Sequence, residues 1–317
     1  MRIGIDMMGG DYAPGVTVEG LKLAFKELPE DVTYHLFGDQ AILEDMMKDF
    51  PLSDSRFVFV NAPDLVDMGD DPMRAFANKK ESSLVKGFTY LAEGKIDVFC
   101  SAGNSGVMLV GAISGIGVIP GVIRPCVTVL LPREDGGSVL LLDVGINPEC
   151  RPEVLLQYGK MGSLFMKHVM KIESPRVGLM NIGSEAKKGN TQIKATYGLM
   201  KESTAFEFIG NIEGYDLFSD ECPDVVVCDG FVGNVILKYT EGLYVMLKRR
   251  NLVDEHIEKF NYEHIGGTPF LGINKNIILG HGISNHLAVK AMIINSYNVE
   301  MSGINRIFYN AFENEKV

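Results

Sequence analysis

The sequence predicts an α/β fold built on a mostly parallel sheet. Short apolar runs typical of buried strands alternate with longer segments in which apolar residues have helical spacing. The first three strands are expected at residues 3–6, 34–38 and 57–61, with helices at 16–28 and 41–50 between them. Because parallel strands need a crossover connection, this alternation indicates βαβ units.

The rest of the chain continues the alternation. A long helix is expected over 72–93, followed by a strand at 96–99 and an apolar run at 107–119. Strands at 127–131 and 139–143, joined by a short Gly-rich turn, predict a hairpin. The remaining expected elements are helices at 152–171, 191–201, 235–248 and 286–312 and strands at 177–182, 206–210, 224–229 and 277–280. We expect the 317 residues to form a single domain.

Composition restricts the classes of function. A formal net charge of −11 and a pI near 5.1 argue against nucleic acid as a partner, since phosphate backbones need clustered positive charge. The five cysteines have no CxxC spacing, so neither a disulfide framework nor a zinc site is indicated. No signal peptide precedes the first strand, and the longest apolar run, 107–119, is too short to span a bilayer. We therefore expect a reduced, cytoplasmic protein.

The loop over residues 101–106 joins a strand end to a helix start. Ser101, Asn104 and Ser105 offer side-chain hydrogen bonds, while Gly103 and Gly106 let the backbone approach a ligand closely. The N–H groups at a helix start and the positive end of its dipole favour an anion. This combination predicts an oxyanion site; the alternative is an ordinary turn capped by Asn or Ser.

Comparable junctions recur along the chain. The candidate residues are Asp6, Gly9, Gly10 and Asp11 after the first strand, Lys80 and Ser82 on the 72–93 helix, Asn147 in the turn after 139–143, Glu185, Lys187, Lys188, Gly189 and Asn190 before the 191–201 helix, Asp229, Gly230 and Asn234 after 224–229, and His281 after 277–280. Because the carboxyl ends of parallel strands meet at one sheet edge, we expect one shared anion site. The alternative is a set of solvated turns, with Lys80 on a solvated helix face.

Several catalytic fingerprints are missing from the sequence. It contains no GxGxxG dinucleotide loop, no GxxxxGK[ST] phosphate loop, no GxSxG nucleophile elbow and no HExxH metal motif. The six histidines are scattered and propose no metal. We therefore expect chemistry that depends on positioning and stabilising a bound anion, with neither a metal nor a cofactor.

Six segments carry a resemblance to a known family. They are IDMMGGDYAP, FCSAGNSG, LLLDVGINP, RVGLMNIGSEAKKGN, VVVCDGFVGNVILK and GHGISN, in this order along nearly the whole chain. Together they resemble the bacterial acyl-ACP:phosphate acyltransferase (PlsX) family of phospholipid synthesis. The resemblance implies a three-layer α/β/α sandwich, related to the isopropylmalate dehydrogenase and phosphotransacetylase folds, that works as a homodimer. It also implies reversible formation of acyl phosphate from inorganic phosphate and a long-chain acyl-ACP, the first step of glycerophospholipid synthesis.

The candidate residues fit this implied chemistry. Phosphate is itself a competent nucleophile, so no protein Ser or Cys nucleophile is required. The residues expected to position phosphate and the acyl carbonyl are Ser101, Asn104, Ser105, Lys187, Lys188 and Asn190. Asp229 or His281 is the candidate proton donor to the leaving thiolate, and Asn234 and Lys187 complete the catalytic set.

The implied carrier protein is acidic, so its binding to a chain of charge −11 requires a local basic surface. Lys248, Arg249 and Arg250 form the densest basic run and are the candidate. Between about 243 and 262 the chain is shorter than the family pattern, which there resembles two projecting helices linked to membrane-surface attachment. Either this member lacks the projection or the sequence lacks part of it, so weak peripheral membrane association stays open.

Two other functions stay open from the sequence. A metal- and NAD-dependent decarboxylating dehydrogenase on a similar fold would need clustered acidic ligands and an adenosine-binding loop, which the sequence does not reveal. A noncatalytic acyl-carrier or lipid-binding protein is the second alternative, and formation of acyl phosphate would exclude it.

Overall fold

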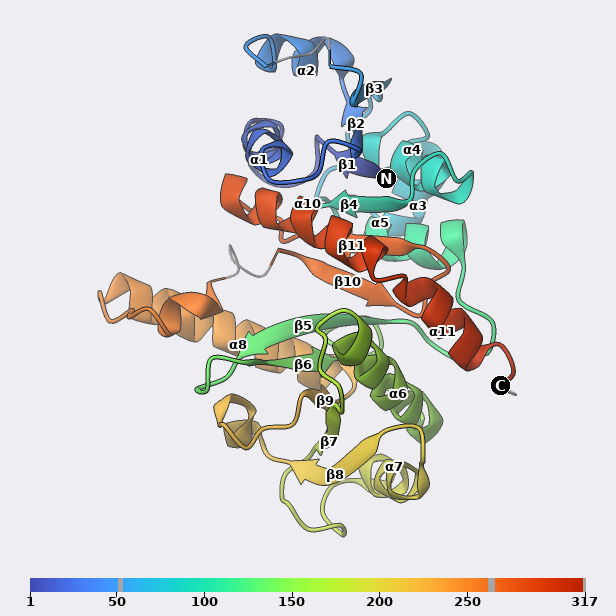
Figure 1. The fold of residues 1–317 in the computed structure, drawn as a ribbon, viewed down its shortest axis with the longest axis vertical. Helices are drawn as coiled ribbons and strands as arrows, with labels where there is room; N and C mark the ends of the chain where they lie inside the picture. The colour runs from blue at the N-terminus through green and yellow to red at the C-terminus, as the bar shows by residue number, and fades with distance from the viewer. Residues whose placement is uncertain (51–53, 262–265, 316–317) are drawn as a thin grey trace. The chain divides into compact units, whose positions relative to one another are not determined.

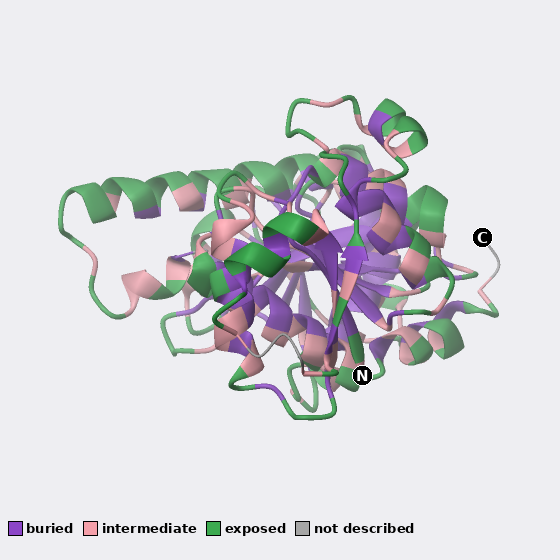
Figure 2. Ribbon diagram, turned by 90° about the horizontal axis from the view of Figure 1, so that it is seen from above, coloured by how far each residue is buried: buried purple, intermediate pink, exposed green. Residues whose placement is uncertain are grey.

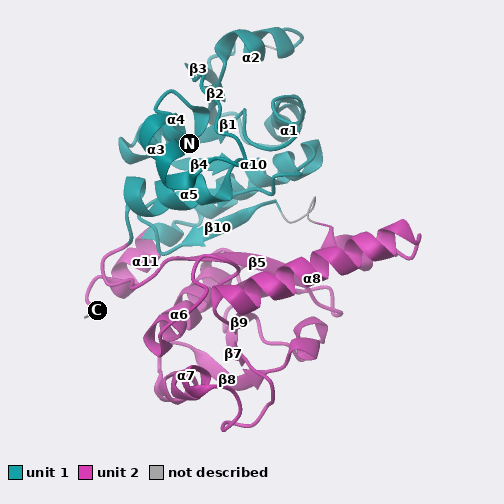
Figure 3. Cartoon of the chain, turned by 180° about the vertical axis from the view of Figure 1, so that it is seen from behind, with its two compact units in different colours: residues 1–118, 262–305 teal, residues 119–261, 306–317 magenta. Residues whose placement is uncertain are grey.

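The computed structural model of the chain describes residues 1–50, 54–261 and 266–315. The chain divides into two compact units (Figure 3): unit 1 comprises residues 1–118 and 262–305, and unit 2 comprises residues 119–261 and 306–317. Each unit contains mostly parallel strands with helices on both faces (Figure 1), as the strand–helix alternation predicts. That the whole chain acts as one phosphate acyltransferase domain stays a prediction.

The described strands of unit 1 are β1 (Arg2–Asp6), β2 (Thr33–Gly38), β3 (Phe57–Asn61), β4 (Val98–Ser101), β10 (Thr268–Leu271) and β11 (Asn276–Leu279), in the order β3-β2-β1-β4-β11-β10. All of these run parallel except β10, which is antiparallel to β11. Strand β4 lies between β1 and β11, so Cys100 pairs in register with Ile5 and Ile278. The carboxyl ends of β1, β4 and β11 therefore lie together at one edge.

The described helices of unit 1 are α1 (Gly15–Phe25), α2 (Gln40–Met46), α3 (Pro72–Asn78), α4 (Ser83–Ala92), α5 (Ser105–Val110), the π-helix η1 (Gly111–Ile116) and α10 (His286–Met301). Helices α1 and α10 pack on one another on one face of the sheet, and α3, α4 and α5 cover the other (Figure 1). The last helix, α11 (Ile304–Phe312), begins at the end of unit 1 and lies mostly in unit 2.

The described strands of unit 2 are β5 (Cys126–Pro132), β6 (Ser138–Leu142), β7 (Arg176–Met180), β8 (Glu207–Ile212) and β9 (Val225–Val227), in the order β5-β6-β9-β7-β8. The predicted hairpin is confirmed as the antiparallel pair β5 and β6, and the other pairs are parallel. Helices α6 (Pro152–His168) and α7 (Thr191–Glu202) lie on one face and α8 (Gly230–Arg249) on the other (Figure 1). Short 3₁₀-helices η2 (Gly214–Phe218) and η3 (Ile257–Phe260) complete the unit.

The cores of both units are the strands themselves. Figure 2 shows buried residues concentrated there, and every residue of β4 and β9 is buried. A parallel sheet covered by helices on both faces buries both sides of each strand, so its strands form continuous apolar runs such as Val225–Val227.

Two helices that the sequence presents as single are each divided in two. The 72–93 segment forms α3 and α4, because Ser82 adopts an extended backbone and its hydroxyl accepts the N–H of Val85, which starts a new helix. The 286–312 segment forms α10 and α11, separated at Gly303, whose φ of +65° a helix cannot contain. Because the helical periodicity of the sequence continues through both interruptions, the prediction of two long single helices was wrong.

Two other boundaries differ from expectation. Helix α8 begins at Gly230 rather than at 235, because Asp229 accepts the N–H of Val232 and caps the helix. Gly230 and Asn234 therefore lie in the first turns of a helix and not in a loop. The apolar run 107–119 lies mostly in α5 and the π-helix η1, which ends at Ile116, just before Gly117 with φ +88°.

Candidate functional site

Three loops of unit 1 meet at the carboxyl ends of β1, β4 and β11. Asp6 accepts the Ser101 hydroxyl through Oδ2 at 2.6 Å and the Met8 N–H through Oδ1 at 3.0 Å. The Ser101 Oγ in turn accepts the N–H of Gly103 at 2.9 Å. The Asp11 N–H donates to the carbonyl of Gly282 at 2.8 Å and so connects the first loop to the His281 loop. The sequence prediction that these strand ends lie together is correct within unit 1.

The Asp6–Ser101 pair is fully enclosed. Asp6 is 1% exposed and Ser101 is 0% exposed, so neither side chain reaches a solvent-borne ligand in this conformation. Burial raises the pKa of the Asp6 carboxyl, and hydrogen bonds from Ser101 and the following backbone partly oppose that rise. A Cβ on Gly9 would lie 2.4 Å from Asp6 Oδ2 and 2.7 Å from the Gly103 nitrogen, so only glycine allows this close approach. These residues hold the loops together.

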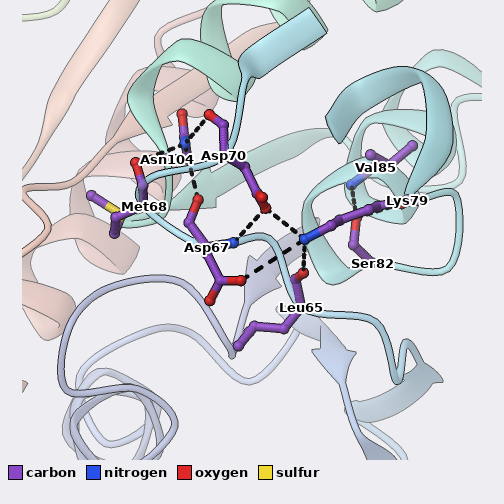
Figure 4. A network of polar contacts seen from close by, with 8 residues as sticks. All are labelled: Leu65, Asp67, Met68, Asp70, Lys79, Ser82, Val85 and Asn104. Carbon is purple, nitrogen blue, oxygen red and sulfur yellow. Dashed lines mark hydrogen bonds and ion pairs between the residues drawn. The ribbon is translucent and has the colours of Figure 1, made fainter. Parts of the chain in front are cut away.

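Asn104 is the centre of a second network in unit 1 (Figure 4). Its Oδ1 accepts the Val107 N–H and caps α5, while its Nδ2 contacts the carbonyls of Asp67 and Met68, each at 3.1 Å. Lys79 holds the same segment, since its Nζ donates to the Asp70 carboxylate at 2.6 Å and to the Leu65 carbonyl at 2.7 Å. The Asn104 side chain is therefore engaged within the protein, and its role toward substrate stays a prediction.

Other candidates of unit 1 lie in different surroundings. Lys80 lies in the turn after α3, and its amine donates to the carbonyl of Phe76 in that helix at 3.0 Å and lies over the Phe76 ring. Ser82 is buried and caps α4 (Figure 4). Ser105 is exposed at the start of α5. His281 is half-buried, and its Nδ1 accepts the Ile283 N–H at 3.4 Å.

In unit 2, a buried aspartate that was not among the candidates organises the 143–147 turn. Asp143 is 0% exposed and accepts the N–H groups of Val127, Gly145, Ile146 and Asn147 at 2.7–3.3 Å. Burial raises the pKa of its carboxyl, against these backbone hydrogen bonds. The only feature of the sequence that could have identified Asp143 is its position at the end of a strand, shortly before a glycine, and Asp6 has the same position.

This turn fixes the start of α8. The Asn147 amide donates to Asp143 and to the Tyr158 hydroxyl, and the Asn147 carbonyl accepts the Gly230 N–H at 2.7 Å. Asn234 donates from Nδ2 to the Val144 carbonyl at 3.2 Å. The structure thus brings Asn147, Gly230 and Asn234 together beside the half-buried Asp229. Asn147 itself is 7% exposed, which makes its side chain part of the turn.

The 183–190 loop follows β7 and precedes α7, which Asn190 caps by accepting the Ile193 N–H at 2.9 Å. Lys187, Lys188 and Glu185 are exposed, and neither lysine forms a side-chain hydrogen bond or ion pair with another described residue. Gly189 has φ +87°, a conformation that suits glycine. Two ammonium groups that have no counter-ion in the described part of the chain, close to the positive end of a helix, are suited to an anion.

The three basic residues Lys248, Arg249 and Arg250 are all exposed at the end of α8. Asp229 caps the other end of this 20-residue helix, about 28 Å away at 1.5 Å per residue. The basic run is therefore separate from the Asp229 turn. Of the 243–262 segment, residue 262 lies outside the described residues.

Among residues 1–50, 54–261 and 266–315, no group of three or more His, Cys, Asp and Glu side chains is arranged to hold a metal. No helix in this part of the chain combines the length and apolarity needed to cross a membrane.

Comparisons with known proteins agree with this architecture. The family model described as "Fatty acid synthesis protein" matches residues 1–306. A phosphate acyltransferase of Caldicellulosiruptor bescii is 40% identical over 311 residues, covering 91% of each chain, and one of Salinibacter ruber is 35% identical over 98% of each. A phosphotransacetylase structure from Streptococcus pyogenes superposes with a TM-score of 0.63 at 15% identity, covering 95% of this chain and 94% of that one, and a Staphylococcus aureus EutD phosphotransacetylase superposes with 0.62. At such low identity the structural matches establish the fold alone.

Proposed function

Since the chain belongs to the phosphate acyltransferase (PlsX) family of fatty acid synthesis proteins, we propose that it forms acyl phosphate from inorganic phosphate and a long-chain acyl-ACP. A phosphate oxygen attacks the thioester carbonyl carbon, the carbon–sulfur bond then breaks, and the carrier thiolate leaves and takes up a proton. The reaction is reversible and would supply the first step of glycerophospholipid synthesis.

The observation that carries this proposal is the 183–190 loop. Its exposed lysines and the positive end of α7 offer charge and N–H donors to a phosphate dianion. Bound phosphate would lose translational freedom and face a fixed direction of attack, which is the main catalytic contribution available without a protein nucleophile.

The cysteines support direct attack by phosphate. All five are buried, and burial raises the pKa of the thiols of Cys100, Cys150 and Cys222 to about 12. Burial also raises the pKa of the other two thiols. A thiol is a useful nucleophile only as the thiolate, so none of these five groups suits a covalent acyl-enzyme intermediate. Asp229 and His281 stay the candidates for protonating the leaving thiolate.

The test is an assay of acyl phosphate formation with purified full-length protein, in which long-chain acyl-ACP and acyl-CoA are compared as donors. We expect activity with acyl-ACP, and replacement of Lys187 and Lys188 by Ala should raise the KM for phosphate at least tenfold. The matched control is Lys194→Ala with Lys201→Ala, which removes the same charge from exposed positions on α7. Absence of acyl phosphate with either donor would reject the function, and equal effects of both double variants would reject the loop.

We also propose that the basic run on α8 binds the acidic carrier. Lys248, Arg249 and Arg250 are exposed on a chain of charge −11, so they provide a local surface of the opposite sign. Replacing all three by Glu should weaken acyl-ACP binding most at low salt and leave the KM for phosphate unchanged. Unchanged carrier affinity at low salt would reject this surface.

The homodimer is a third proposal, and the exposed side of α8 supports it. Phe231, Val235, Tyr239 and Met246 are 66%, 53%, 73% and 48% exposed, and their spacing places them on one side of the helix. An apolar stripe of this length favours a second copy of the chain. Tyr239→Glu should shift the molar mass measured by light scattering from dimer to monomer. A wild-type monomer that binds anionic vesicles through this stripe would instead assign it to a membrane surface.

A further inference from the structure

Two buried asparagines lie beneath the 183–190 loop. Asn181 follows β7 and Asn211 lies in the neighbouring parallel strand β8, and each is 8% exposed. The Asn211 Nδ2 donates to the carbonyl of Glu185 at 2.9 Å and to that of Ser184 at 3.5 Å. The Asn181 Nδ2 donates to the carbonyl of Lys188 at 3.3 Å. Three peptide groups of the loop are thus held from the sheet side.

These bonds determine which way the loop presents its N–H groups. The three peptide bonds that follow Ser184, Glu185 and Lys188 are trans, so each N–H points opposite to its carbonyl. With the carbonyls directed at the asparagines, the N–H groups of the next residues, Glu185, Ala186 and Gly189, point away from the sheet. None of them has an acceptor among the described residues. They flank the exposed lysines, so the asparagines, together with the bond of the Lys188 N–H to the Glu185 carbonyl at 3.0 Å, orient the donors on this side of the loop.

Asn211 carries a further sign that its purpose is not stability alone. Its Oδ1 is buried and has no hydrogen-bond partner among the described residues. A buried acceptor without a partner costs free energy that a smaller or apolar side chain would avoid. The Asn211 Nδ2 donates to the loop, whereas its Oδ1 is unsatisfied. We expect such an arrangement where holding the loop in place matters more than the stability of the fold.

We infer that Asn211, assisted by Asn181, is a positioning residue for the phosphate substrate. It acts through the loop: its amide holds the Ser184 and Glu185 carbonyls, and the loop then presents its N–H groups and the two lysines to phosphate. This inference rests on the proposed function of the same loop. Neither asparagine was among the sequence candidates. Asn181 lies inside the RVGLMNIGSEAKKGN segment but was not singled out, and Asn211 lies in strand β8, outside the quoted segments.

The test is the phosphate dependence of acyl transfer in Asn211→Ala. We expect the KM for phosphate to rise about tenfold, with the KM for acyl-ACP unchanged, because two hydrogen bonds to the loop are lost. Asn181→Ala loses one bond and should raise the same KM about threefold. The matched control is Asn295→Ala, since Asn295 donates in the same way to the consecutive carbonyls of Gly266 and Gly267 in unit 1. Its KM for phosphate should equal that of the wild type.

A second measurement separates positioning from general destabilisation. If Asn211 acts by placing the lysines, Asn211→Ala should raise the KM much less in a chain that already carries Lys187→Ala and Lys188→Ala. Full additivity would overturn the inference, as would an unchanged KM in an active Asn211→Ala protein. Asn181→Ala supplies the same test where Asn211→Ala does not fold. Wild-type protein without acyl phosphate formation would reject the proposed function, whereas wild-type activity with unaffected variants rejects this inference alone.

Discussion

Two loops of the molecule have the same position between a strand and a helix, but the polar side chains of one are buried and those of the other are exposed. The 101–104 loop of unit 1 and the 183–190 loop of unit 2 each follow a parallel strand and end at an asparagine that caps the next helix, Asn104 or Asn190. In unit 1 the polar side chains turn inward, where Ser101 donates to Asp6 and Asn104 holds the segment containing Asp67 (Figure 4). In unit 2 the loop's lysines are exposed.

The difference shows that partners distant in sequence decide what a Gly/Ser/Asn loop can do. Asp6 is 95 residues from Ser101, and Asp67 is 37 residues from Asn104, yet these contacts engage the unit 1 side chains. In unit 2, Asn211 lies 26 residues from Glu185 and donates hydrogen bonds to backbone carbonyls of the loop, not to its side chains. We therefore expect substitutions in the 101–104 network to lower mainly the free energy of unfolding, and substitutions in the 183–190 loop to raise mainly the KM for phosphate.

The largest stability effect is expected for Asp6→Ala. The Asp6 side chain is 1% exposed, and removing its carboxylate leaves the Ser101 hydroxyl and the Met8 N–H without their acceptor. The free energy of unfolding should fall by about 3 kcal/mol, measured in urea. Asp11→Ala, an exposed aspartate of the same loop, is the control and should be near wild type. A small loss in Asp6→Ala would break the assignment of the unit 1 network to stability.

The two helix caps give a direct comparison of the loops. Asn104→Ala removes a cap and the amide contacts to Asp67 and Met68, and should cost about 2 kcal/mol. Asn190→Ala removes a cap from an exposed position and should cost about 1 kcal/mol. Urea unfolding of both variants measures the contrast. Equal losses would mean that the contacts to the 67–70 segment add nothing to stability.

The pH dependence of stability sharpens the role of Asp6 further. Because burial raises its pKa, the folded chain keeps a proton on Asp6 at pH values above 3.8 at which the unfolded chain has lost it. Raising the pH through that window therefore weakens folding. Asp6→Asn resembles the protonated acid and does not titrate, so its stability relative to wild type should improve from about pH 4 to pH 7. Parallel pH profiles of the two proteins would show that Asp6 ionises normally.

Much of the fold could be predicted because it depends on local patterns. Alternating apolar strands and helices identified most elements, and the hairpin of β5 and β6 was confirmed. The failures are equally physical. Ser82 and Gly303 interrupt helices without interrupting the 3.6-residue periodicity, and the cap at Asp229 starts α8 early.

The site was predictable only in part. Strand ends that carry Asp6, Ser101 and the His281 loop do meet, since parallel strands place their carboxyl ends together. Asp143 and Asn211 could not be selected from the sequence, because their importance comes from which backbone groups surround them after folding. Lys80 lies in the turn after α3, and its amine folds back onto the Phe76 carbonyl of that helix, a contact that the sequence did not reveal. Its role toward phosphate stays a prediction.

The smallest effect on stability is expected for Lys187→Ala with Lys188→Ala, the double variant that should raise the KM for phosphate. Lys187 and Lys188 are exposed and have no ion pair with another described residue, so replacing both by Ala removes no native contact of their ammonium groups. The melting temperature should stay within about 1 °C of wild type while the KM for phosphate rises, measured by calorimetry and steady-state kinetics on the same preparations. A fall of more than about 3 °C would show that the lysines support the loop itself, and the contrast with the 101–104 network would then disappear.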